Sequence, residues 1–160
     1  MGAIILYVFV LIDAYFCVTI ISNKPLWAEG GHTMYNTIQT EDDIRYFYEK
    51  TNQLHDGYII DMRYENNGIA KIENGHRYDA KKTKLVLKIL VTSIWDTVVE
   101  IEFENLFDWQ IRQQGWQDIY ATTVRLGEQN QIVWWDGAHF EDVKEGSYVI
   151  AESMRWRIAP

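Results

Sequence analysis

Apolar and polar positions divide the chain into two parts of different character. From Ala3 to Ser22 the residues are almost continuously apolar, and Asp13 is the one charged position in that run. Beyond residue 34, apolar positions recur with the periods of helices and strands instead. The pattern predicts an apolar N-terminal segment over residues 1–33 and a single globular domain over residues 34–160.

The first element of the domain is expected to be a helix in the segment TEDDIRYFYEKTN, residues 40–52. Ile44, Phe47 and Tyr48 have the i, i+3, i+4 spacing that gives a helix one apolar face. Thr40 is a suitable N-cap, and the three acidic residues after it suit the positive end of the helix dipole. The helix should stop at the end of this segment.

After the helix the apolar period changes to two, which is the repeat of a half-buried strand. Asn-Gly pairs at 67–68 and 74–75 mark turns. The strands are expected at residues 58–65, 69–73, 84–91, 97–111, 119–127, 131–137 and 147–158. The pattern predicts an α+β fold, in which one N-terminal helix packs against a mostly antiparallel, twisted sheet or open barrel of about seven strands.

The composition favours a protein partner over a nucleic acid or a membrane surface. The 160 residues are 48% apolar and include seven tryptophans, which is enough for a substantial core. The formal net charge is −8, whereas nucleic acids and anionic lipids are bound by basic surfaces. An acidic domain suits a basic protein partner, although acidity is also an ordinary property of soluble proteins.

The sequence contains no signature of a cofactor or a metal site. Cys17 is the single cysteine, so the domain cannot form a disulfide or a zinc–cysteine site, and this fits a reducing compartment. His76, Asp79, Asp136 and His139 lie near turns, but their spacing matches no known metal motif. A glycine-rich phosphate loop and a GxSxG motif are absent as well, so we expect no cofactor.

Residues 3–22 have the length and composition of a membrane-spanning helix. Asp13 disfavours insertion by roughly 2.5–3.5 kcal/mol, but each Ile, Leu, Val or Phe favours it by roughly 0.3–0.6 kcal/mol, so the sum favours a membrane anchor. Lys24 would then leave the domain in the cytoplasm by the positive-inside tendency. A signal peptide fits less well, because no basic residue precedes the run and no small-x-small cleavage site follows it.

A third interpretation makes residues 1–33 a mis-assigned extension of the reading frame. Glu29-Gly30-Gly31 can be encoded as GAA-GGA-GGT, a purine-rich ribosome-binding sequence of the bacterial kind, and it stands a short spacer before the Met34 codon. T-rich noncoding DNA also yields Ile, Leu, Val and Phe codons. Met34 would then be the initiator, and this interpretation also places the domain in the cytoplasm.

The motif LHDG follows the predicted helix. His55 and Asp56 would suit an acid–base or ligand pair. The alternative is a turn that ends the helix, in which Asp56 caps local N–H groups and Gly57 permits an unusual backbone conformation.

Two further motifs, SIWD and VWWDG, place Trp95-Asp96 and Trp135-Asp136 at strand ends or turns. An exposed tryptophan beside acids is typical of an interface anchor. The alternative is a tryptophan at the margin of the core whose indole N–H donates to a carboxylate. Because Trp134 and Trp135 face opposite sides of a strand, only one of them can belong to the core layer under the helix.

The strand expected at 97–111 carries Glu100, Glu102 and Glu104 at period two, so three carboxylates should share one face. This stripe suits the docking of Lys and Arg from a basic partner. A solvated sheet face or a charge-protected edge is the alternative. Lys84 and Lys88 on the preceding strand could pair with the stripe and neutralise it.

Four segments together, LHDGYI, VVEIEFENL, VWWDG and YVIAESMRWR, resemble a group of small uncharacterised bacterial α+β proteins. These proteins carry an early L/F-H-D motif and end in a basic-aromatic strand, and some are similar to immunity proteins of toxin systems. The resemblance covers residues 40–158. It implies a toxin-neutralising binding protein and brings no catalytic residues with it.

The leading hypothesis is therefore a non-enzymatic protein-binding domain, with an immunity protein that neutralises a basic toxin as its specific form. The expected contact residues are Trp95, Asp96, Glu100, Glu102, Glu104, Trp135 and Asp136. One alternative is a small enzyme that uses His55 and Asp56. Another is a membrane-anchored accessory domain, in which only residues 3–22 would contact the membrane.

If Met34 is the initiator, intact-mass measurement of the natively expressed protein will show a chain that begins at Met34 or Tyr35. Recovery of a membrane-bound species that retains residues 1–33 would contradict this start site.

Overall fold

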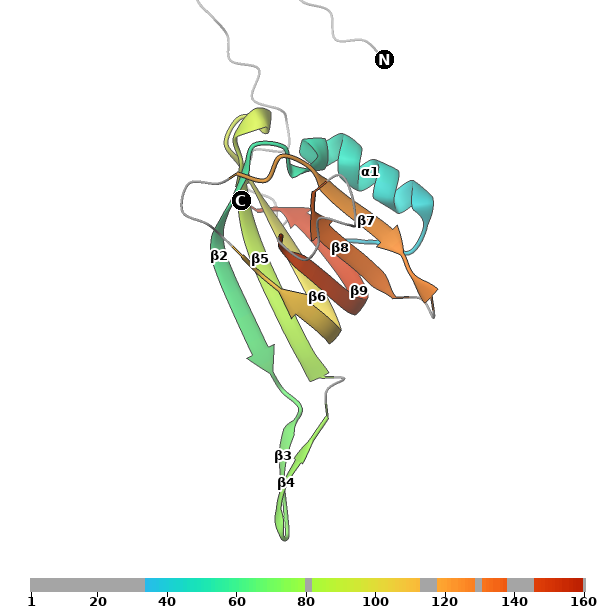
Figure 1. Ribbon diagram of the computed structural model, residues 1–160, viewed down its shortest axis with the longest axis vertical. Coiled ribbons are helices and arrows are strands. Elements are labelled where there is room, and N and C mark those ends of the chain that lie inside the picture. The colour runs from blue at the N-terminus through green and yellow to red at the C-terminus, as the bar shows by residue number, and fades with distance from the viewer. Residues whose placement is uncertain (1–33, 80–81, 113–117, 129–130, 138–145, 160) are drawn as a thin grey trace, which may run out of the picture. The chain divides into compact units, whose positions relative to one another are not determined.

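The computed structural model describes residues 34–79, 82–112, 118–128, 131–137 and 146–159, which include one α-helix and nine strands (Figure 1). The apolar segment over residues 1–33 and His139 lie outside the described residues. No described helix has the length and apolar character that crossing a membrane requires. The three interpretations of residues 1–33 therefore stay predictions.

Helix α1 (Glu41–Thr51) begins after the N-cap that the sequence predicts. The Thr40 hydroxyl accepts the N–H of Asp43 at 3.2 Å, and the Asp43 carboxylate accepts the N–H of Thr40 at 2.8 Å, which completes a capping box. Hydrogen bonds from Thr40 and Gln39 hold the pKa of Asp43 below its ordinary value. The helix ends at Asn52, which has the left-handed φ of 50° that commonly terminates helices.

Nine strands and two short 3₁₀ turns make up the remaining regular structure. The strands are β1 (Asn36–Thr37), β2 (Gly57–Asn66), β3 (Ile69–Ile72), β4 (Gly75–Tyr78), β5 (Thr83–Val91), β6 (Thr97–Gln110), β7 (Thr122–Leu126), β8 (Ile132–Asp136) and β9 (Tyr148–Ile158). The turns are η2 (Asn52–Leu54) after α1 and η4 (Thr92–Ile94) between β5 and β6. Each predicted strand overlaps an observed one, whereas the sequence pattern does not indicate β1 or β4.

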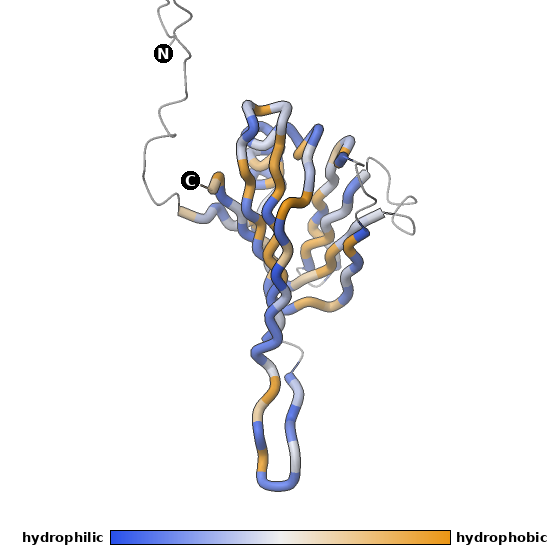
Figure 2. Tube along the Cα trace, turned by 90° about the vertical axis from the view of Figure 1, so that its left-hand side faces the viewer, coloured by the Kyte–Doolittle hydropathy of each residue, from blue (hydrophilic) through white to orange (hydrophobic). Residues whose placement is uncertain are grey.

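Seven strands form one antiparallel sheet in the order β2–β5–β6–β9–β8–β7, with β1 paired to β9 (Figure 1). The sheet is open, so the α+β prediction is confirmed in its sheet form and the barrel does not form. β3 and β4 make a separate hairpin that continues beyond the ends of β2 and β5. Figure 2 shows hydrophobic and hydrophilic positions alternating along the strands, as the period of two predicts.

The hydrophobic core lies between α1 and one face of the sheet. Phe47 of α1 meets Trp156 of β9 edge to face, with ring centroids 5.3 Å apart. The largest buried side chains of the sheet come from adjacent central strands and include Leu87, Ile89, Ile101, Phe103, Trp134 and Met154. Leu54, in the turn after α1, is also fully buried and ties that turn to the core.

The two edges of the sheet differ in what covers them. At β7, the Tyr48 hydroxyl of α1 accepts the N–H of Val124 at 2.7 Å and approaches its carbonyl at 3.3 Å, so the helix blocks the backbone of that edge. Burial raises the pKa of Tyr48 and keeps the hydroxyl protonated. At β2, the described residues pair outward only at Gly57, which forms a bridge with Ile119.

Gly57 is expected to be required where β2 leaves the turn after α1. A Cβ atom there would lie 2.5 Å from the carbonyl oxygen of Leu54 and 3.0 Å from a methyl group of Ile89. Gly57→Ala should lower the free energy of unfolding by about 1–3 kcal/mol, measured by urea denaturation. Gly127→Ala is the matched control, because its Cβ would meet its neighbours at 3.4 Å or more. Equal losses in both variants would contradict the steric argument.

Candidate functional site

Two loops that the sequence singles out meet at one end of the sheet. Residues 52–57, which contain LHDG, connect α1 to β2, and residues 92–96, which contain SIWD, connect β5 to β6. Because β2 and β5 are hydrogen-bonded neighbours, with Gly57 opposite Val91, the two loops lie side by side. Together with residues 118–121, which reach the same end of β2, we call them the loop site.

The backbone of the loop site is unusual. Seven non-glycine residues with positive φ occur among the described residues, and six of them belong to these two loops. They are Asn52, Gln53, Leu54, Asp56, Trp95 and Asp96, with φ between 50° and 63°. Left-handed conformations cost about 1–2 kcal/mol per residue for L-amino acids other than glycine, and such strain is concentrated at functional sites.

Hydrogen bonds between the loops hold this strained backbone in place. The N–H and the hydroxyl of Thr92 both donate to the carbonyl of Asp56, at 3.2 and 3.1 Å. The Ser93 hydroxyl donates to the carbonyl of His55 and accepts from the side-chain amide of Asn52 at 3.1 Å. These bonds fasten the turn before β2 to the turn before β6, so the two loops form one rigid unit.

Trp95 is the most exposed large hydrophobic residue of the described chain, with 92% of its surface accessible. Its left-handed backbone, with φ of 63°, follows η4 directly. Ile94, the residue before it, packs against the core instead. The turn therefore presents the indole ring to solvent, in agreement with the interface-anchor interpretation of SIWD and against the core-margin alternative.

Residues 118–121 add an aromatic side chain that the sequence does not single out. Gly57 and Ile119 exchange backbone hydrogen bonds of 3.5 and 2.8 Å, which brings this segment against the start of β2. Tyr120 is exposed, and its ring centroid lies 5.2 Å from that of His55. The sequence pattern places Tyr120 inside a strand beginning at 119, whereas β7 starts three residues later.

The charges of the loop site are acidic. Asp56, Asp96 and Asp118 belong to its three segments, and none of these segments contains a lysine or an arginine. His55 lies among them, with its Nδ1 atom 3.0 Å from Oδ1 of Asp56. The site therefore combines two exposed aromatic rings with a local excess of negative charge.

The His55–Asp56 pair has the distance of an acid–base dyad. Both side chains are 42% exposed. The Ser93 hydroxyl donates to the backbone carbonyl of His55 and not to its imidazole, so the imidazole does not activate this hydroxyl as a nucleophile. These contacts support a hydrogen-bonded turn more directly than a catalytic triad.

The glutamate stripe of β6 is not the exposed docking surface that the sequence analysis proposed. Glu100 and Glu102 are only 6% and 7% exposed. Arg157 contacts Glu100 at 2.6 Å, and Arg155 contacts Glu102 at 2.5 Å.

The pairing with lysines of β5 that the sequence predicts is present as well. Lys88 lies 3.8 Å from Glu100, and Lys84 lies 3.3 Å from Glu102 and 3.4 Å from Glu104.

The part of the sheet face opposite the helix that β2, β5 and the paired ends of β6 and β9 form is in fact neutral, and we call it the neutral face. Its charged side chains alternate in sign from strand to strand in the observed register, for example Asp61, Lys88, Glu100 and Arg157 in one row. The five acidic and five basic residues of this part are Asp61, Glu65, Glu100, Glu102, Glu104, Arg63, Lys84, Lys88, Arg155 and Arg157, and Asp108 and Arg125 lie on the same side of the sheet beyond it. Cross-strand pairs of opposite charge stabilise a sheet, and they leave this face with no net charge for steering a partner.

Tyr35 also belongs to this charged cluster, although no pattern in the sequence indicates its role. Its hydroxyl contacts one oxygen of Glu100 and donates to Glu102 at 2.6 Å. Its ring lies under the guanidinium groups of Arg155 and Arg157, at 4.7 and 4.5 Å from the ring centroid. Burial and the two carboxylates raise the pKa of Tyr35. Burial opposes ionisation of both glutamates, but hydrogen bonds from Tyr35 and the arginines outweigh it and lower their pKa values.

Trp135 and Asp136 at the end of β8 also differ from the expected exposed pair. Trp135 is only 2% exposed, although it faces away from Trp134, so the anchor interpretation does not hold for it. Burial raises the pKa of Asp136. The end of β8 nevertheless approaches the loop site, because the N–H of Gly137 donates to the carbonyl of Ala121 at 2.7 Å.

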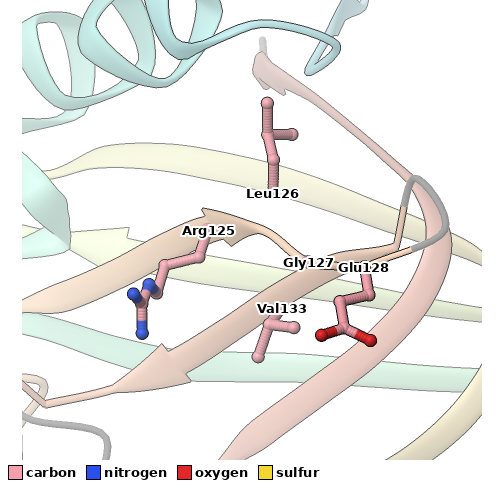
Figure 3. A pocket seen from close by; sticks show the side chains of 5 residues that line it. All are labelled: Arg125, Leu126, Gly127, Glu128 and Val133. Carbon is pink, nitrogen blue, oxygen red and sulfur yellow. The ribbon is translucent and has the colours of Figure 1, made fainter.

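A pocket of about 660 Å³ lies at the turn between β7 and β8, outside the loop site (Figure 3). Arg125, Leu126, Gly127, Glu128 and Val133 line it. Figure 3 shows the side chains of Arg125 and Val133 on one side of the hairpin and that of Leu126 pointing toward the helix. Within the described ranges, no three His, Cys, Asp or Glu side chains gather in a way that could hold a metal ion.

Comparison of the chain with protein-family models, with curated proteins and with solved structures finds no match. The interpretation of the loop site therefore rests on its own geometry.

Tyr35→Phe tests the charged cluster. Removing a hydroxyl bonded to charged groups should lower the free energy of unfolding by about 1.5–3 kcal/mol near pH 7. Because Tyr35 stabilises glutamates whose pKa values are lowered by folding, its contribution is present above the unfolded value near 4.3 and is lost as the pH falls through the lowered values. Urea denaturation from about pH 7 down to about pH 2 should therefore show the two proteins converging.

The matched control is Tyr148→Phe, whose hydroxyl donates to Asp108 at 2.9 Å on the exposed surface. This change should cost about 0.5 kcal/mol or less. A loss in Tyr35→Phe that is equally small, or that does not depend on pH, would show that the cluster is not held together by the Tyr35 hydroxyl.

Proposed function

We propose that this chain is a non-enzymatic protein-binding domain that uses the loop site to contact a basic protein. The observation that carries the proposal is the exposure of Trp95 on a rigid, strained turn. A tryptophan ring that stays in water loses apolar contacts, and a left-handed backbone adds a further cost. A partner that covers the ring would recover that burial, and tryptophan is among the residues that most often dominate binding energy.

Rigidity makes Trp95 a better anchor than an equally exposed residue on a free loop. The hydrogen bonds of Thr92 and Ser93 to the neighbouring loop fix the turn before any partner arrives. A partner then meets a preorganised ring and spends less conformational entropy on ordering it. Tyr120 and His55 extend the aromatic surface next to the same loops.

The acidic groups that face the partner are those of the loop site and not those of β6. Glu100 and Glu102 are buried under arginine, lysine and Tyr35, so they are already paired within the domain. Asp56, Asp96 and Asp118 have no basic residue in their own segments. Three carboxylates around two aromatic rings suit lysine and arginine side chains, through charge pairing and cation–π contact.

The specific form that we propose is an immunity protein that neutralises a basic toxin in the cytoplasm. Support comes from the net charge of −8 and from the resemblance of residues 40–158 to small uncharacterised bacterial proteins, some of which are similar to immunity proteins. The absence of cysteine after Cys17 fits a reducing compartment. The inhibitor needs no catalytic group, because a bound acidic surface can block a basic active site directly.

A small enzyme that uses His55 and Asp56 is the second candidate, and the 3.0 Å distance between their side chains favours it. The exposure of both groups favours the binding function, because catalytic acid–base pairs are usually shielded from water. We expect His55→Ala to stay folded and still neutralise the toxin. This result would argue against the enzyme, because His55 is its proposed acid–base group.

Binding kinetics against the product of the neighbouring gene, over a range of salt concentrations, test the proposal. Trp95→Ala should speed dissociation and weaken binding by about 30-fold or more, the size of a hot-spot loss. Asp96→Lys should slow association and reduce its dependence on salt, because peripheral charges act mainly on encounter rates.

Two control variants keep this test specific. Phe107→Ala removes an exposed aromatic ring outside the loop site, and Glu104→Gln removes a half-exposed carboxylate of the neutral face. Neither should change the binding kinetics more than about twofold. If Trp95→Ala binds as tightly as these controls, the loop site is not the contact surface.

A further inference from the structure

Along most of the edge strand β2, no residue among those the structure describes pairs with the outward side of the backbone. In the sheet order it lies outermost and pairs inward with β5 from Gly57 to Asn66, with a β-bulge at Ile60 between Ile59 and Asp61. Ile119 forms the one outward bridge that the described residues make with β2, at Gly57. Figure 1 shows β2 as a long outer strand, with the β3–β4 hairpin continuing from its far end. Unpaired N–H and C=O groups along such an edge are a template for pairing with another chain.

The opposite edge of the same sheet, strand β7, is covered by helix α1. At β7 the Tyr48 hydroxyl bonds the outward N–H of Val124, and helix α1 lies across the strand. β7 has five residues, whereas β2 has ten. Long open edges favour association, and short or covered edges avoid it. The fold therefore blocks one edge and leaves the other available.

On one face of β2 the side chains are apolar and exposed. Ile60, Met62 and Tyr64 are exposed, and the Tyr64 ring stacks on that of Trp109 with centroids 5.5 Å apart. Tyr64 and Met62 lie opposite Leu85 and Leu87 of β5, so they extend the core face of the sheet outward. A strand added at this edge would cover them.

The charged side chains of β2 alternate in sign along its other face. Asp61, Arg63 and Glu65 lie at period two, and the intrastrand contact between Arg63 and Glu65 is 2.8 Å. When two copies of one strand pair antiparallel across a twofold axis, one residue lies opposite its own copy at the axis. The choice of that central residue sets every other pair. Centred on Met62, Asp61 of each copy meets Arg63 of the other, whereas a pair centred on Arg63 would oppose like charges.

We propose that β2 binds β2 of a second copy of this chain, antiparallel and centred on Met62, and so joins the two sheets into one across a twofold axis. The pairing is isologous, so each favourable contact occurs twice. On the charged face, two Asp61–Arg63 pairs form. On the core face, Met62 meets Met62 of the other copy, and Tyr64 comes opposite Ile60, the residue at the bulge of β2. A pair centred on Tyr64 would also match charges, but it would place Met62 against Asn66.

Charge inversion tests both the interface and its register. The full-length chain should sediment with a mass that rises with concentration toward twice 18.9 kDa. Arg63→Glu puts like charges at both symmetric positions and should weaken dimerisation at least about tenfold. The swapped double variant, Asp61→Arg with Arg63→Glu, restores opposite charges only if the pair is centred on Met62, and should recover the dimer.

The control is Arg125→Glu, which makes the same charge change on β7 and should dimerise like the parent chain. Unchanged urea midpoints for Arg63→Glu and the double variant would show that loss of the dimer is not loss of the fold. A parent chain that stays monomeric overturns the proposal and leaves the edge to a different chain. The proposal is also overturned if Arg63→Glu dimerises like the parent chain, or if the swapped double variant does not recover the dimer.

Discussion

The structure depends on a central strand that is buried on both faces. β6 lies between β5 and β9, and its period of two places Val99, Ile101 and Phe103 in the core under the helix and Glu100 and Glu102 on the opposite face. Buried carboxylates are tolerated only with charged or hydrogen-bonding partners, because desolvation otherwise disfavours their ionised form. The neighbouring strands provide lysines on one side and arginines on the other, and the segment before β1 provides Tyr35.

This internal neutralisation decides which acids are available for function. The net charge of −8 could lie anywhere on the domain, but the neutral face balances five acids with five bases. The loop site, with Asp56, Asp96 and Asp118, combines unbalanced charge with an exposed Trp95. The two proposed surfaces are separate. The loop site lies at the end of the sheet where α1 stops, and the proposed pairing edge runs along β2 away from it, so a dimer could bind two partners.

Local signals in the sequence predict local structure well. The Thr40 capping box, the apolar face of α1 and the alternation along β6 all follow from neighbours in sequence, and so does the pairing of Lys84 and Lys88 with the glutamates. The roles of Tyr35, Arg155 and Arg157 depend on contacts 53 or more residues apart, which one sequence does not reveal. The left-handed turns are equally hidden, because Leu54 and Trp95 are not residues that favour positive φ. The expected exposure of Trp135 was wrong for a related reason. Strand alternation shows which side of the sheet a ring faces, but not which other residues cover that side.

Glu100 and Glu102 are neutralised inside the domain and, in our proposal, take no part in binding. Their side-chain carboxyl ¹³C shifts, followed by NMR during an acid titration of the folded protein, test this most directly. We predict that the pair titrates with apparent pKa values below the ordinary glutamate value of about 4.3, and that both values rise in Tyr35→Phe. Ordinary or raised values that do not change in Tyr35→Phe would contradict the account and return the β6 stripe to the list of possible contact surfaces.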